Sequence, residues 1–389
     1  MRMLVADELA RAPLDGLALL GVEIRHEPSL TAGALPGAVG EVDILVVRDT
    51  VVSAATVEAA KELNLIIHAD RGADVVDVAA ASQHGVYVAH CPSPRVPAVA
   101  ELTLGMLLAL DRGLVSADPG ERDVGAARGV FGRRLGIAGM GRVGQRVAAT
   151  AAAMGMRVMA WSRGLTPRRA ERLGVTRADS LEALAAGVDV LSLHLPLVPS
   201  TRHVVDATVL RALPRGAVLL NAAHPALVDP EALTRVAVAR ELRVGLDMSP
   251  APETPAPELS PARLCAVRSA AGATLQAEDA IATEVSRIVR AFLSEGDVPN
   301  VINVMGNTAA RYALILRSRD EVGVLANVLA VIKRHGLNIT EVKNHVFEGA
   351  SAACTKLNIS GRPTDRCLAE ICAFDEVFHV DVVPLPNLA

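Results

Sequence analysis

The fold of this chain is decided by the stretch Arg134-Leu-Gly-Ile-Ala-Gly139-Met-Gly141-Arg-Val-Gly144-Gln-Arg. A short apolar run leads into three glycines spaced G-x-G-x-x-G. A helical apolar pattern then continues to Gly155, and a second apolar run covers 157–161. In such a strand–turn–helix–strand unit the first glycine makes the tight turn, the second lets the backbone approach a pyrophosphate, and the third lets the helix pack closely on the strand. The helix N-terminus offers N–H groups and a positive dipole end to the phosphates. The stretch therefore predicts dinucleotide binding, whereas a glycine-rich turn in another α/β unit is the weaker alternative.

The position about 20 residues past the motif separates NAD from NADP, because an acidic residue there binds the ribose of NAD. Here the second strand ends in Trp161-Ser162-Arg163, without a carboxylate. An arginine can accept a 2′-phosphate, which favours NADP. The alternative is a solvated Arg163, with NAD held by other contacts. The sequence therefore predicts NAD or NADP as the cofactor and leaves the choice open.

Composition narrows the class of protein. The 389 residues allow two or three domains. A net charge of −4, two tyrosines and no basic tract argue against a nucleic-acid partner. The five cysteines form no C-x-x-C pair, so we expect a reducing compartment, no disulfide and no metal site. Without an apolar run of about 18 residues or a signal-type leader, we expect a cytoplasmic protein with no membrane partner.

Strands and helices alternate through most of the chain, which predicts parallel α/β domains. A first domain is predicted at 1–96, including a helix at 10–20, and is completed by a helix within 276–300. The nucleotide-binding domain is predicted at 97–275. Residues 308–389 follow the order strand, helix, strand, strand, helix, strand, which is ferredoxin-like. The predicted fold class is thus α/β, with two doubly wound Rossmann-like domains and a C-terminal βαββαβ domain.

Taken together, these segments resemble the phosphoglycerate dehydrogenases within the D-2-hydroxyacid dehydrogenase family, including their C-terminal ACT domain. Besides the glycine motif, the matching stretches are 46–48, 76–82, 99–105, 191–197, 227–229, 245–247 and 347–354. The resemblance implies that the first domain binds substrate, that 308–389 is an ACT regulatory domain, and that the protein is a homodimer or homotetramer.

The cofactor half of the family's site is present in this sequence. The resemblance implies that the aspartate at Asp247 contacts the nicotinamide carboxamide. The full set of cofactor-binding residues that we predict is Gly139, Met140, Gly141, Arg142, Val143, Gly144, Ser162, Arg163, Pro196, Ala222 and Asp247.

The family's catalytic Arg, Glu and His are not retained. The Arg stretch reads Asn221-Ala-Ala-His224-Pro225, the Glu position holds Pro252, and the His stretch reads Ser-Ala-Ala-Gly-Ala over 269–273. Hydride transfer from a hydroxyl carbon needs a base for the proton and a fixed cation for the developing carbonyl. Losing a general base costs about 10²–10⁴-fold in rate. We therefore expect the family's own reaction to be nearly lost unless other residues replace these.

His224 is the best replacement base, because imidazole titrates near neutral pH, and Glu253 is its candidate partner. The alternative is an ordinary loop histidine. Arg48 survives from the family's anion binders, and Arg71 and Arg95 are further candidates to bind an anionic substrate. For the last two, a surface arginine is the alternative.

Three further histidines are assigned no chemistry: His68 and His90 are interpreted as bystanders at strand ends, and His194 as structural. In the predicted ACT domain only Asn338 matches the family's serine-binding residues, so we expect a different small effector or a role in assembly. The leading hypothesis is an NAD(P)-dependent oxidoreductase acting on an altered anionic hydroxy or oxo acid with a rebuilt catalytic site. The alternatives are an inactive cofactor-binding sensor or scaffold, and non-redox chemistry on the same fold.

Overall fold

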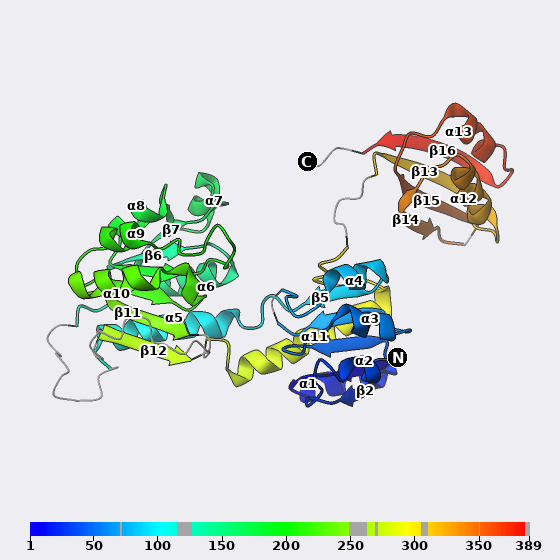
Figure 1. The fold of residues 1–389 in the computed structure, drawn as a ribbon. Helices are drawn as coiled ribbons and strands as arrows, with labels where there is room; N and C mark the ends of the chain where they lie inside the picture. The colour runs from blue at the N-terminus through cyan, green and yellow to red at the C-terminus, as the bar shows by residue number, and fades with distance from the viewer. Residues whose placement is uncertain are drawn as a thin grey trace. The chain divides into compact units, whose positions relative to one another are not determined.

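The computed structural model describes residues 1–70, 72–114, 127–248, 263–268, 271–304, 310–349 and 351–385. The chain divides into two compact units, 1–303 and 304–389 (Figure 1). Within the described residues, no helix has the length and apolarity needed to cross a membrane.

In the described part of the chain, the first sheet has five parallel strands in the order β2-β1-β3-β4-β5. The strands span Arg2–Val5 (β1), Glu23–His26 (β2), Ile44–Val47 (β3), Leu65–His68 (β4) and Tyr87–His90 (β5). The short helices are α1 (Ala12–Asp15), the 3-10 helix η1 (Ala18–Leu20), α2 (Leu35–Ala38), α3 (Ala54–Ala59) and α4 (Val78–Gln83). Strands β3 and β4 are buried at every position because both faces of the sheet are covered.

The long helix α11 (Leu275–Glu295) returns from the second sheet to the first (Figure 1). It begins at Thr274, whose hydroxyl accepts a backbone N–H of the first turn, and ends at Gly296, which has a φ of 67°. Its Ile281 packs into the same core as Met3 of β1. The carboxyl end of the first sheet and the start of α11 therefore belong to one packed body.

Over residues 134–248 and 263–268, a second parallel sheet has the order β12-β11-β10-β9-β6-β7-β8. Its strands are β6 (Arg134–Ala138), β7 (Arg157–Trp161), β8 (Thr176–Arg177), β9 (Val190–Leu193), β10 (Val218–Asn221), β11 (Arg243–Met248) and β12 (Leu264–Arg268). Its helices are α5 (Val96–Asp111), α6 (Arg142–Ala153), α7 (Pro167–Arg172), α8 (Leu181–Ala186), α9 (Ala207–Ala212), the 3-10 helix η4 (Pro225–Leu227) and α10 (Pro230–Ala239). The strand order reverses between β6 and β9. The carboxyl ends at such a switch point are where doubly wound sheets bind ligands.

Over 310–349 and 351–385, the second unit forms an antiparallel sheet with the order β14-β15-β13-β16. Its elements are β13 (Tyr312–Arg319), α12 (Val324–Arg334), β14 (Ile339–Val346), β15 (Ala352–Ile359), α13 (Asp365–Cys372) and β16 (Val377–Pro384). A core formed within this unit joins both helices to the sheet. The predicted α/β class and the βαββαβ order are confirmed.

Some predicted elements were wrong or incomplete. The helix expected at 10–20 is replaced by α1 and η1, because Pro13 suits only a first turn and Gly16 packs against the Arg290 side chain. Edge strands β2 and β12 were not predicted. Helix α3 ends at Ala59, because Ala60 has an extended backbone conformation. The five prolines within 250–261 predict a loop, and this segment lies outside the described residues.

Candidate active site

A cavity of about 940 Å³ lies against the glycine-rich turn. It is bounded by the loop after β6, the end of β7, the segment after β9, the end of β10, and residues that follow β4 and β5. Of the residues predicted to bind cofactor or substrate, those that line it are Arg95, Gly139, Met140, Gly141, Arg142, Val143, Ser162, Arg163, Pro196 and Ala222.

The glycine turn has the shape that a pyrophosphate requires. At Gly139, where φ is 104°, a Cβ would lie 2.6 Å from the carbonyl oxygen of His194, and at Gly144 it would lie 2.0 Å from that of Gly139. At Gly141, the N-cap of α6, a Cβ would meet nothing within 4 Å. The turn is therefore closed against the protein at two glycines and open at the third. The free space at Gly141 lets a ligand's phosphates approach the backbone, so this turn fits a dinucleotide.

The end of the cavity beside β7 is basic. Ser162 and Arg163, two of the predicted cofactor-binding residues, line it together with Arg169 of α7. The Arg169 guanidinium donates to the Met140 carbonyl oxygen at 3.2 Å and so ties α7 to the glycine turn. Arg169 was not predicted from the sequence, although its place in the first turn of the helix that follows β7 could have suggested it. Among the described residues that line the cavity, the acidic side chain is that of Asp70, which follows β4.

His194 lines the cavity behind the turn, and its Nε2 lies 2.8 Å from the Ser192 hydroxyl oxygen. Burial lowers the pKa of His194 to about 4, from an ordinary 6.5. The imidazole is therefore neutral at physiological pH. Its structural role remains a prediction, but a side chain with this pKa is a poor base for neutral-pH chemistry.

The depressed pKa of His194 predicts a pH-dependent loss of stability. The unfolded chain protonates this histidine below about pH 6.5 and the folded chain only below about 4, so stability falls as pH falls through that window. The loss should be about 2–3 kcal/mol by about pH 4.5. In urea unfolding, His194→Gln should lose less stability than wild type between neutral pH and that point. Equal losses in the two proteins would contradict the assignment.

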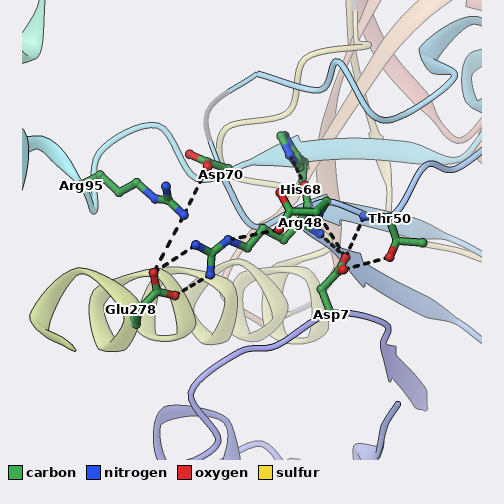
Figure 2. A network of polar contacts seen from close by, with 8 residues as sticks. Asp7, Arg48, Thr50, His68, Asp70, Arg95 and Glu278 are labelled. Carbon is green, nitrogen blue, oxygen red and sulfur yellow. Dashed lines mark hydrogen bonds and ion pairs between the residues drawn. The ribbon is translucent and has the colours of Figure 1, made fainter. Parts of the chain in front are cut away.

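The predicted substrate arginines have different surroundings (Figure 2). Arg95 lines the cavity. Its Nε and Nη2 are buried without a hydrogen-bond partner among the described residues, although Nη2 lies 3.4 Å from an Asp70 carboxylate oxygen. Arg48 instead gives both terminal nitrogens to the Glu278 carboxylate, at 2.6 and 3.1 Å, and does not line the cavity. Arg71 lies outside the described residues. Glu278 was not predicted from the sequence.

The backbone around Arg48 is held as firmly as its side chain. One Asp7 carboxylate oxygen accepts the backbone N–H groups of residues 48, 49 and 50, and the other accepts the Thr50 hydroxyl (Figure 2). Nε2 of His68 lies 3.0 Å from the Arg48 carbonyl oxygen, and its Nδ1 lies 2.9 Å from that of Gly72. Through these contacts His68 connects the loop after β3 with the loop after β4 at the carboxyl edge of the sheet.

The structure does not bring His224, the predicted catalytic base, to the cavity. His224 is exposed and does not line the cavity. Its Nδ1 accepts the N–H of Ala226 as the N-cap of η4. A neutral ring in this role carries its proton on Nε2 and cannot take another there. Glu253 lies outside the described residues. Asp247 also does not line the cavity, and its carboxylate accepts the N–H of Ala271 at 2.8 Å.

In the second unit, a shallow hollow of about 380 Å³ includes Asn338, the predicted effector residue. It is formed by the end of α12 and the turn into β14, with Lys333 as its charged side chain. The Asn338 backbone exchanges hydrogen bonds with Ser360, whose hydroxyl accepts and whose N–H donates. The hollow is thus open to solvent, and two hydrogen bonds fix the backbone of Asn338 beside it.

Comparison with known proteins agrees with this geometry. Residues 105–267 match the NAD-binding domain of the D-isomer specific 2-hydroxyacid dehydrogenases. A D-3-phosphoglycerate dehydrogenase of Mycobacterium tuberculosis is 35% identical over 340 residues, which are 84% of this chain and 64% of that protein. A hydroxypyruvate reductase of Thermotoga maritima is 37% identical over 217 residues, which are 54% of this chain and 69% of that protein. This chain therefore spans just under two thirds of the mycobacterial relative.

A solved structure is similar over most of this chain. The TT0316 protein from Thermus thermophilus is 33% identical, with a TM-score of 0.65 over 78% of this chain and 100% of that one. The predicted use of a nicotinamide dinucleotide, NAD or NADP, is confirmed at the level of the matched domain. The predicted family resemblance is confirmed too: this chain belongs to the D-isomer specific 2-hydroxyacid dehydrogenase family.

Proposed function

We propose that this protein is an NAD(P)-dependent oxidoreductase acting on a small anionic 2-hydroxy or 2-oxo acid through a rebuilt catalytic site. One observation carries the proposal. The cavity that has the dinucleotide cradle at Gly141 is also lined by Arg95, two of whose N–H groups make no hydrogen bond among the described residues. Arg95 is ion-paired with Asp70, and a substrate carboxylate would supply the hydrogen-bond acceptors that these N–H groups lack.

Each part of the cavity has a role in this proposal. The backbone at Gly141 and the start of α6 bind the phosphates, and Arg95 orients the substrate by its carboxylate. When bound, the nicotinamide supplies the hydride chemistry. His224 stays our candidate base, and it can take a proton at Nδ1 only if the hydrogen bond from the Ala226 N–H to that atom breaks.

A second candidate is a cofactor-binding protein without turnover, and the cavity's own titratable groups favour it. Burial raises the pKa of Cys91 to about 12, and that of His194 is lowered to about 4. Neither group is suited to accept a proton near neutral pH. Such a protein would serve as a redox-state sensor or scaffold, with the same dinucleotide bound.

The first measurement is a titration with NADH and NADPH on the full chain. Trp161, the single tryptophan, lines the cavity, so bound reduced cofactor should quench its emission. A turnover screen over 2-oxo and 3-phosphohydroxy acids follows on the same sample. Turnover that disappears in His224→Ala would establish the rebuilt enzyme. Binding without turnover on any acid would favour the sensor, and no binding would end both proposals.

We expect Arg163 to select NADPH, because the strand end beside it offers no carboxylate to the ribose. Arg163→Ser should lower the affinity for NADPH by about tenfold or more and leave that for NADH nearly unchanged. The matched control is Arg168→Ser, which removes an exposed arginine of α7 that does not line the cavity. Equal losses for both cofactors, or none, would contradict this role.

We also propose that the second unit is an ACT regulatory domain, that a small effector binds at Asn338, and that the protein is a cytoplasmic homodimer or homotetramer. The hollow beside Lys333 favours an effector with a carboxylate. Thermal-shift screening of amino acids against wild type and Asn338→Ala tests the effector, and light scattering tests the assembly.

A further inference from the structure

The arrangement around Glu278 bears on which acids the cavity accepts. Arg48 and Arg95 approach the same carboxylate from two directions, as Figure 2 shows. Arg48 makes two hydrogen bonds to Glu278, and Arg95 Nη2 lies 3.9 Å from one of its oxygens. A carboxylate of the chain itself therefore fills the space between the two guanidinium groups, next to the part of the cavity that Arg95 lines.

The Arg48 guanidinium is consequently not available to bind a substrate anion. It is paired with Glu278, and the backbone N–H and carbonyl of Arg48 are held by Asp7 and His68. A bidentate arginine–carboxylate pair that is only about a fifth to a third exposed does not exchange readily for an external anion. Of the described arginines in this cluster, Arg95 alone still has buried N–H groups without hydrogen bonds, and it lines the cavity.

The local charge disfavours a second anionic group on the substrate. Besides Glu278, the Asp70 carboxylate lies 3.4 Å from Arg95. A phosphate placed next to these two carboxylates would meet like charge in a partly buried site, and like-charge contacts exclude ligands as strongly as matched ones attract them. A single substrate carboxylate is balanced by Arg95, whereas a second anionic group would meet Asp70 and Glu278 after Arg48 is already paired.

We infer that Glu278 is a specificity-determining residue that occupies the second anion position and restricts the site to acids with one anionic group. The substrate class is then the unphosphorylated monocarboxylic 2-hydroxy and 2-oxo acids. This inference rests on the proposed function, because it assigns the substrate class of that same site.

The test uses two probes with one skeleton, glycolate and 2-phosphoglycolate, and measures their binding to the full chain by calorimetry. Wild type should bind glycolate more tightly than 2-phosphoglycolate. Glu278→Ala and Glu278→Gln should each shift that preference toward 2-phosphoglycolate by about tenfold or more, because Ala removes and Gln neutralises the carboxylate that pairs with Arg48. The matched control is Asp279→Asn, which removes one negative charge at the adjacent, exposed position and should keep the wild-type preference.

The inference is overturned if wild type prefers 2-phosphoglycolate, if it binds neither probe, or if both Glu278 variants keep the wild-type ratio. Thermal unfolding checks each variant, and if Glu278→Ala does not fold, the isosteric Glu278→Gln and the wild-type preference still decide. Because these measurements need no turnover, they separate the two failures. If the protein transfers no hydride, the dehydrogenase proposal fails, but its preference between the two anions can still be measured.

Discussion

Gly144→Ala should abolish dinucleotide binding and lower the free energy of unfolding by about 3 kcal/mol, the upper end of the range for overpacking a buried site. The reason is geometric. An added Cβ would lie 2.0 Å from the Gly139 carbonyl oxygen and 3.2 Å from a methyl carbon of Ile137, so α6 must move away from β6. That shift would displace the helix N-terminus that faces the phosphates.

Gly141→Ala is the matched control for this prediction. Its Cβ would meet no protein atom within 4 Å, so urea unfolding should match that of wild type. The methyl group would project where a pyrophosphate approaches, so cofactor-dependent quenching of Trp161 should still be lost. If Gly144→Ala unfolded like wild type, or Gly141→Ala kept full cofactor affinity, the cradle described above would be incorrect.

Asp111→Ala should lower the free energy of unfolding by about 3–5 kcal/mol, because it leaves a buried charge without its partner. The Asp111 side chain is fully buried. It accepts one hydrogen bond from Arg133 at 2.8 Å and another from the N–H of Gly129 at 2.9 Å. Burial already lowers the pKa of Arg133, and the Asp111 charge acts against that shift.

The control for this prediction is the exposed ion pair between Arg215 and Glu241. Arg215→Ala should leave the urea midpoint close to that of wild type, since exposed pairs contribute little to stability. A comparable loss in both variants would mean that the Asp111 effect comes from something other than burial of the charge.

Elements of the fold that are determined by residues close together in sequence could be predicted. The spacing of Gly139, Gly141 and Gly144 predicted the dinucleotide turn. An Asp followed by a Pro is typical of a helix start, and Asp229 does begin α10, where its carboxylate accepts a backbone N–H. Strand β2 was missed because its four residues are at most half-buried and carry little apolar pattern. Edge strands bury fewer side chains, so their sequences show less of the hydrophobic pattern on which such predictions depend.

The candidate site was less predictable because its contacts join distant residues. Glu278 pairs with Arg48 across 230 positions of sequence, so neither local spacing nor composition could show that Arg48 is neutralised. His224 stood at the expected strand end. Whether its imidazole would face substrate or cap η4 depended on the turn that follows. Arg95, which was predicted to bind substrate, does line the cavity, and its role there stays a prediction.

The division of the chain at residue 303 has a thermodynamic consequence. Residues 312–384 close a hydrophobic core of their own, and the cores of the two parallel sheets lie within 1–303. Calorimetry should then show two cooperative melting transitions, and a single two-state melting temperature would not describe the chain. The transition of the second unit provides an internal standard, because substitutions at Gly144 or Asp111 should shift only the other peak.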